Sequence, residues 1–174
     1  MSFYQKVAEV GTKYIKPHKL FKFGFNWSPM YKRSTGKVTF VSKDLMTIKM
    51  KLKISFKNRN YMGSIFGGSL FSSVDPIPMV QLIQILGKEY VVWDKSAEIK
   101  FKRPAKEHLY AEFTYTKEEV ENIKRQIAEN NEFEIEKLTA LTNQDKSIIY
   151  CEVKKTIYIA NKAFFKEKRA KKQA

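Results

Sequence analysis

Strict alternation of apolar and polar side chains is the clearest pattern in the chain. From Ile48 to Phe56 every second residue is apolar, and the residues between are lysines and a serine. A period of two places the two kinds of side chain on opposite faces of an extended segment. These residues are therefore predicted to form a strand with one buried and one solvated face.

Four later segments show the same period and fall into two pairs. Residues 97–102 and 109–115 flank a short polar turn, and residues 133–141 and 148–159 flank a second one. Each pair is predicted to form an antiparallel hairpin. Lys155 interrupts the alternation of the last segment, which indicates a bulge at that position.

Apolar residues spaced by three and four positions predict three helices. One opens the chain over residues 3–16, and a second, apolar over much of its circumference, covers residues 69–86. The third begins with the capping-box residues Thr116 and Glu119 and ends at residues 130–131. The second helix is so apolar that it is expected to be buried against the sheet.

The order of these elements predicts an α+β protein in which an antiparallel sheet covers a central helix. Residues 20–35 are aromatic-rich and irregular, and they are predicted to be a loop packed on the core. No repeat or linker divides the chain, so one domain is expected. It is divided into residues 1–35 with the first helix and the aromatic loop, the core at 36–161, and a frayed basic tail at 162–174.

Composition narrows the classes of function. The 174 residues carry a formal net charge of +15, concentrated in residues 1–60 and 162–174, which favours an anionic partner. The single cysteine, Cys151, excludes a disulfide framework and is expected to be buried, and two separated histidines disfavour a metal site. No apolar run approaches the roughly 18 residues of a membrane span, so a cytoplasmic location without a span is expected.

The segment from Asn58 to Asp75 carries the most specific chemistry. Two adjacent glycines, Gly67 and Gly68, precede the apolar helix, and an acidic residue lies about two turns into it. Glycine lets a backbone N–H approach a ligand closely, and a helix N-terminus favours a negatively charged oxygen. The pattern is typical of an oxyanion-binding turn.

This segment resembles the hotdog-fold acyl-CoA thioesterases of the phenylacetate-pathway type. The resemblance rests on the glycine pair that opens a buried helix, on Asn60 before it and Asp75 after it, and on the order of the strands, and it covers roughly residues 36–161. Several shorter runs resemble an uncharacterised bacterial family of thioesterase-like hotdog proteins. They are Trp27–Pro29, Phe66–Leu70, Val74–Pro76, Leu86–Gly87 and Val92–Lys95.

The resemblance implies an acyl-CoA or other acyl thioester as substrate and a role for each site residue. The backbone N–H of Gly67 would polarise the thioester carbonyl, Asp75 would attack it or activate water, and Asn60 would orient substrate or water. The residues implied to contact substrate are Gly68, Phe66, Ser69 and Asp94. Phe66 departs from the family, which has His at this position, and Asp94 would be a second acid or a structural partner of Lys95.

The resemblance also implies a homodimer or homotetramer, because hotdog sites lie between subunits, and no cofactor beyond the coenzyme A of the substrate. Other interpretations stay open. Asp75 followed by Pro76 is also an ordinary helix start, and Asn60 is a common turn residue. The alternatives are a non-catalytic protein that binds acyl-CoA or a fatty acyl group, and binding of nucleic acid or a membrane surface through the basic regions.

Overall fold

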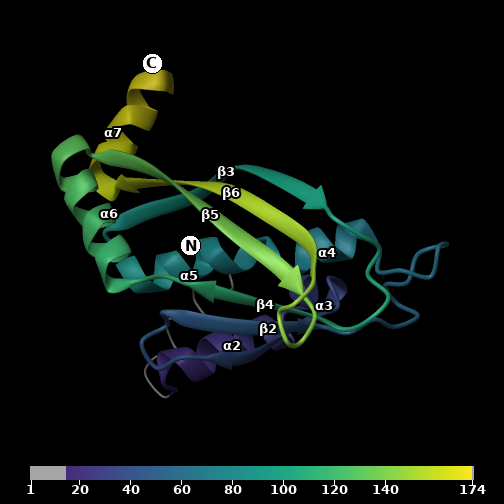
Figure 1. Ribbon diagram of the computed structural model, residues 1–174. Helices are drawn as coiled ribbons and strands as arrows, with labels where there is room; N and C mark the ends of the chain where they lie inside the picture. The colour runs from purple at the N-terminus through teal and green to yellow at the C-terminus, as the bar shows by residue number, and fades with distance from the viewer. Residues whose placement is uncertain (1–14, 174) are drawn as a thin grey trace.

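The computed structural model describes residues 15–173 and has α+β architecture, as the sequence predicts. A single antiparallel sheet curves around a central helical segment (Figure 1). The strands, in their order across the sheet, are β1 (Gly36–Val41), β2 (Thr47–Leu52), β4 (Leu109–Thr114), β5 (Glu132–Thr142), β6 (Ile149–Asn161) and β3 (Tyr90–Phe101).

The central segment consists of α4 (Gly67–Val74) and α5 (Pro76–Leu86), separated by a turn at Asp75. It confirms the predicted buried helix and ends at Gly87, whose φ of 87° and N–H bond to the Ile83 carbonyl close the last turn. Within residues 15–173 it is the one helix long and apolar enough to cross a membrane by composition. Here it packs against the sheet, with Leu70, Val74, Ile77, Leu82 and Leu86 buried.

The predicted strand at residues 48–56 is confirmed as β2, but β2 ends at Leu52. Asn58 explains the early end: its amide donates to the Lys53 carbonyl, and its Oδ1 accepts from the Ser55 N–H. These hydrogen bonds hold the backbone of Lys53 and Ser55 in a local turn, so it does not continue the strand. Phe56, in phase with the buried face of β2, is therefore 87% exposed.

The predicted hairpin of residues 97–102 with 109–115 is wrong. β3 pairs along its length with β6, at one edge of the sheet, while β4 lies between β2 and β5. The connection between β3 and β4 is anchored elsewhere, because the Ala105 carbonyl accepts from the Ile65 N–H and the Lys102 N–H donates to Tyr150. Alternation identified both strands but carries no information about their partners.

The second predicted hairpin, β5 with β6, is confirmed. So is the intervening helix α6 (Lys117–Asn130), which starts with the Thr116 and Glu119 capping box and ends at Asn131 with φ of 66°. The predicted bulge at Lys155 is wrong, since β6 keeps its register there. The irregularity lies in β3, between Asp94 and Ser96.

The two ends of the described chain are helical, against prediction. Residues 20–35 fold into α2 (Pro17–Trp27) and α3 (Pro29–Arg33), because each proline occupies the first helical position and does not disrupt a helix. Tyr31 of α3 is fully buried, and its hydroxyl donates to the Ser73 carbonyl of α4. The tail forms α7 (Lys162–Gln173), whereas the predicted helix at residues 3–16 lies almost wholly outside the described residues.

Candidate active site

The glycine turn lies at the start of α4, at the end of the molecule farthest from α7 (Figure 1). The Phe66 N–H donates to the Asn58 carbonyl over 2.7 Å, which aligns the chain for the helix. The N–H groups of Gly67 and Gly68 donate to no other residue that the structure describes. Two unpaired donors at the positive end of a helix dipole form a site suited to an oxyanion.

Two aromatic rings cover this turn and limit the space for a side chain at either glycine. A Cβ atom at Gly68 would lie 2.3 Å from Cε1 of Phe66, and one at Gly67 would lie 3.0 Å from Cζ of Phe101. Both rings are 58% exposed. The turn therefore offers backbone donors beside an apolar surface, and the Phe66 ring contributes packing without a hydrogen bond.

Asn60 is engaged in a turn of its own. Its amide donates to the Ser64 hydroxyl over 3.0 Å, and its Oδ1 accepts from the Ser64 N–H over 3.1 Å. This arrangement fits the turn-former interpretation of Asn60. Ser69, the other polar residue of the motif, is buried in the first turn of α4, where its N–H donates to the Phe66 carbonyl.

Asp75 occupies the N-cap position of α5, directly before Pro76, but its side chain does not cap the helix. Its backbone is helical, with φ of −48° and ψ of −54°, and its side chain makes no capping hydrogen bond to α5. The carboxylate accepts from Nζ of Lys155 over 2.7 Å, and the Asp75 carbonyl oxygen accepts from the same Nζ over 2.6 Å. The side chain is 38% exposed, so one face of the carboxylate remains accessible.

Lys155 is the site residue that the sequence analysis missed. It lies on the inner face of β6 between Val153 and Ile157, and its side chain is 2% exposed. Its third acceptor is Asp94, whose Oδ2 lies 2.6 Å from Nζ. All three ammonium protons are thus satisfied. The signal for Lys155 was a lysine in a position where alternation requires a buried side chain, since a buried ammonium needs anionic partners.

We call Asp75, Asp94 and Lys155 the carboxylate cluster. It holds one more negative than positive charge when both acids are ionised. Burial raises the pKa of Asp94 above its ordinary range, and the charge of Asp75 adds to this, while the hydrogen bond and charge of Lys155 oppose it. Of the two roles expected for Asp94, that of a structural partner of Lys95 is wrong, because Lys95 forms an ion pair with Glu134 over 2.6 Å.

The structure brings Asp75 and Asp94 together but leaves the glycine turn apart from them. Asp75 lies eight positions after Gly67, which corresponds to about 12 Å along a helix axis. A group that attacks a carbonyl must lie about 3 Å from the carbon whose oxygen the N–H groups bind. Within residues 15–173 no group of three His, Cys, Asp or Glu side chains is arranged to hold a metal ion.

Comparisons with known proteins assign the chain to a family. The family described as "Domain of unknown function (DUF4442)" matches residues 18–159. The chain belongs to this DUF4442 family. No curated protein matches the sequence.

Solved structures similar to this family member have the hotdog fold. One is a probable thioesterase of unknown function from Pseudomonas aeruginosa, with 18% identity, a TM-score of 0.73, and coverage of 83% of this chain and 96% of that one. A zebrafish thioesterase superfamily member 2 has 12% identity, a TM-score of 0.54, and coverage of 83% and 94%. A Haemophilus influenzae thioesterase has 10% identity, a TM-score of 0.52, and coverage of 92% of both chains. At these identities the likeness establishes the fold.

Proposed function

We propose that this DUF4442 protein hydrolyses acyl thioesters, with acyl-CoA as the substrate class. The observation that carries the proposal is the core helix itself. It starts with two unpaired N–H groups and carries, two turns later, a carboxylate held in place by a buried lysine. The N–H groups supply the charge stabilisation that acyl transfer needs, and the carboxylate supplies a nucleophile or a general base.

The complete site requires two subunits in this proposal. Asp75 and Gly67 of one chain are too far apart to act on the same carbonyl, because the helix between them spans about 12 Å. In a two-fold dimer, Asp75 of one subunit would face Gly67 of the other. Asn60, whose amide is committed to Ser64, would contribute by shaping the loop before the turn.

The reaction consumes one water for each thioester. Asp75 either attacks the carbonyl carbon or removes a proton from the attacking water, and the carbonyl oxygen becomes an oxyanion bound by the N–H groups of the glycine turn. On both routes the carbon–sulfur bond then breaks and the thiolate takes up a proton. Attack by water gives the carboxylate directly, whereas attack by Asp75 gives an anhydride with Asp75 that the water then hydrolyses. Asp94, the second acid of the carboxylate cluster, would relay that proton to the thiolate in this proposal.

A non-catalytic acyl-binding protein is the second candidate. Two observations favour it: Phe66 cannot donate a hydrogen bond at the first motif position, and Lys155 neutralises part of the charge that Asp75 would use. Such a protein would bind acyl-CoA and release no thiol.

Hydrolysis of a panel of acyl-CoA thioesters tests the proposal, with released thiol as the signal. The panel covers short, medium, long and aromatic acyl groups. Asp75→Asn keeps the acceptor for Lys155 but removes the base, so kcat should fall by about a hundredfold or more. The matched control is Glu98→Gln, a change to an exposed carboxylate of β3, which should leave the rate unchanged.

Three outcomes contradict the proposal. If Asp75→Asn hydrolyses thioesters as fast as the parent, Asp75 has no chemical role. If the parent protein binds acyl-CoA but hydrolyses no thioester of the panel, the non-catalytic acyl-binding function replaces the proposed hydrolysis. A monodisperse monomer by light scattering at the assay concentration would remove the two-subunit site.

A further inference from the structure

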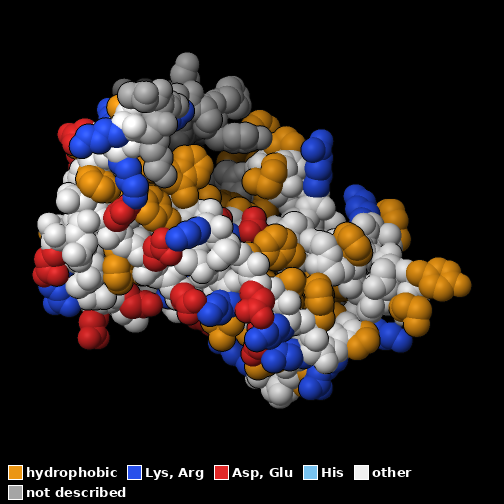
Figure 2. All heavy atoms as spheres, turned by 90° about the horizontal axis from the view of Figure 1, so that it is seen from above, with side chains coloured by type: hydrophobic (Ala, Val, Ile, Leu, Met, Phe, Trp, Pro, Cys, Tyr) orange, Lys and Arg blue, Asp and Glu red, His pale blue; other side chains and the backbone are white. Residues whose placement is uncertain are grey.

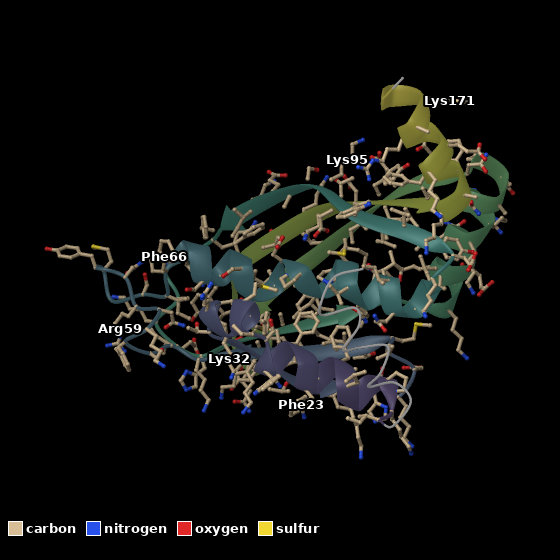
Figure 3. The ribbon with its side chains drawn as sticks, turned by 180° about the vertical axis from the view of Figure 1, so that it is seen from behind. Phe23, Lys32, Arg59, Phe66, Lys95 and Lys171 are labelled. Atoms are coloured by element: carbon tan, nitrogen blue, oxygen red, sulfur yellow. The ribbon has the colours of Figure 1, made fainter. Side chains whose placement is uncertain are left out.

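A projecting loop at the glycine end of the molecule exposes large apolar side chains. We define the tip as residues 53–66, which join β2 to α4. Figure 1 shows it projecting beyond the sheet, and Figure 3 shows Arg59 and Phe66 at this end, away from Lys171 of α7. Its exposed apolar residues include Phe56, Tyr61, Met62 and Phe66, of which Tyr61 is fully exposed and Met62 72% exposed.

These side chains project from an ordered support. Asn58 is buried and bonds to Lys53, Ser55 and Thr35, and the Asn60–Ser64 turn closes the end of the loop. A backbone bridge joins Arg59 to Ile65 at its base. The loop is thus held in a conformation that keeps its aromatic and thioether side chains in water. An apolar group displayed in this way marks a contact surface.

The charge of the tip is uniformly positive. The sequence has no Asp or Glu between Asp44 and Asp75, while Lys53, Lys57 and Arg59 are exposed within the tip. The β3–β4 connection lies beside it, through the Ile65 to Ala105 hydrogen bond, and adds the exposed Arg103 and Lys106. The one acid of this connection, Glu107, accepts a hydrogen bond from the Tyr150 hydroxyl. Figure 2 shows hydrophobic side chains at the end of the projection with basic ones close by.

We propose that the tip docks onto an anionic phospholipid surface. Aromatic and thioether side chains surrounded by cations match a membrane interface, where the apolar groups enter the acyl boundary and the cations approach lipid phosphates. A tip-to-tip contact with a second copy fits less well, because a two-fold axis through the tip would bring its cations together with no acid between them. A lipid surface supplies both the apolar and the anionic partner.

Docking would bring the glycine turn, at the subunit interface of the proposed site, close to the lipid surface. Gly67 follows the tip directly in the sequence, so an acyl thioester partitioned into the leaflet would meet the unpaired N–H groups. This consequence rests on the proposed function and narrows the substrate class to long-chain, membrane-partitioned thioesters. The docking itself does not depend on turnover.

Vesicle co-sedimentation of the full chain tests the docking. The probes are phosphatidylcholine vesicles with and without phosphatidylglycerol. The tip variants are Tyr61→Ser/Met62→Ser and Lys57→Gln/Arg59→Gln, and the matched control is Lys166→Gln/Arg169→Gln, which removes the same charge from exposed positions of α7. Each tip variant should bind anionic vesicles about tenfold more weakly or worse, whereas the α7 control should change by less than about threefold.

The thermal midpoint should be unchanged in all three variants, since the altered side chains are exposed. Equal losses of vesicle binding in the tip and α7 variants would show that binding depends on net charge and not on the tip. That result would overturn the proposal. It is also overturned if the tip variants lose oligomerisation without vesicles, or if single-stranded RNA binds the tip more tightly than vesicles do. Vesicle binding without thioester hydrolysis would leave the docking intact and reject the proposed function.

Discussion

The two ends of α4 are built in opposite ways. The glycine turn at its start comes from one stretch of chain, contains no charge and lies open under two exposed rings. The carboxylate cluster at its end joins three elements, α4–α5, β3 and β6, and buries an ammonium group between two acids. Asp75 and Lys155 are 80 residues apart in the sequence.

This difference predicts that substitutions at the two ends of α4 have unequal effects on the free energy of unfolding. Removing one member of a buried group of ion pairs strongly destabilises the fold, because the remaining charges lose their partner. An open turn with exposed rings can relax by moving a side chain into water. Substitutions at the cluster should therefore affect the free energy of unfolding far more than substitutions at the turn.

Lys155→Met should have the largest effect. It leaves two carboxylates without a cation and should lower the free energy of unfolding by about 3 kcal/mol, the lower end for a broken buried pair because both acids are partly exposed. Urea denaturation measures this. The control is Lys154→Met, whose parent side chain is 46% exposed and paired with Glu136, and which should cost less than about 1 kcal/mol.

A triple variant sharpens the same test. Lys155→Met combined with Asp75→Asn and Asp94→Asn removes the whole charge group and should recover most of the lost stability. If Lys155→Met alone costs no more than Lys154→Met, the cluster is not a structural centre. The contrast between the two ends of α4 then disappears.

The next effect depends on pH. The raised pKa of Asp94 means that the folded state binds a proton more tightly than the unfolded state does. This contribution favours folding at low pH and is lost as the pH rises through the raised pKa. Asp94→Asn mimics the protonated form, so it should be more stable than the parent at pH 7, with the difference vanishing below the ordinary value of 3.8.

Thermal unfolding across this pH range measures the difference, with Glu98→Gln as the exposed control on the same strand. A parent protein that is more stable than Asp94→Asn at pH 7 would show that the attraction of Lys155 outweighs burial.

The comparison also explains what the sequence could predict. The glycine turn, the core helix and the α6 capping box are local, so their residues are visible in one stretch. The α+β class followed from the order of such elements, and the hotdog fold from the resemblance carried by the segment from Asn58 to Asp75. Asp75 and Asp94 were both candidates, yet their partner was missed because it depends on strand pairing. From the sequence, only Lys95, the adjacent residue, was considered as a cation for Asp94. With β3 paired to β6, Asp94 lies opposite Ile157, two residues from Lys155.

The prediction for the N-terminal segment was wrong for a different reason. Residues 20–35 were predicted to be a loop because they are aromatic-rich and irregular, although Pro17 and Pro29 each begin a helix. Packing then decides the conformation, since Phe21 and Phe25 stack one helical turn apart with ring centroids 4.6 Å apart. Such contacts are visible only once the helix exists.

Gly68→Ala should have the smallest effect, and it tests the open end directly. The new Cβ would overlap the Phe66 ring, but that ring is 58% exposed and can rotate into solvent. Alanine also restricts the unfolded chain, which offsets part of the cost, so the free energy of unfolding should change by less than about 1 kcal/mol. Gly68→Ala/Phe66→Ala removes the overlap and should be more stable than Gly68→Ala alone. Urea denaturation of both variants decides the point: a loss near that of Lys155→Met would mean that the glycine turn is packed as tightly as the carboxylate cluster.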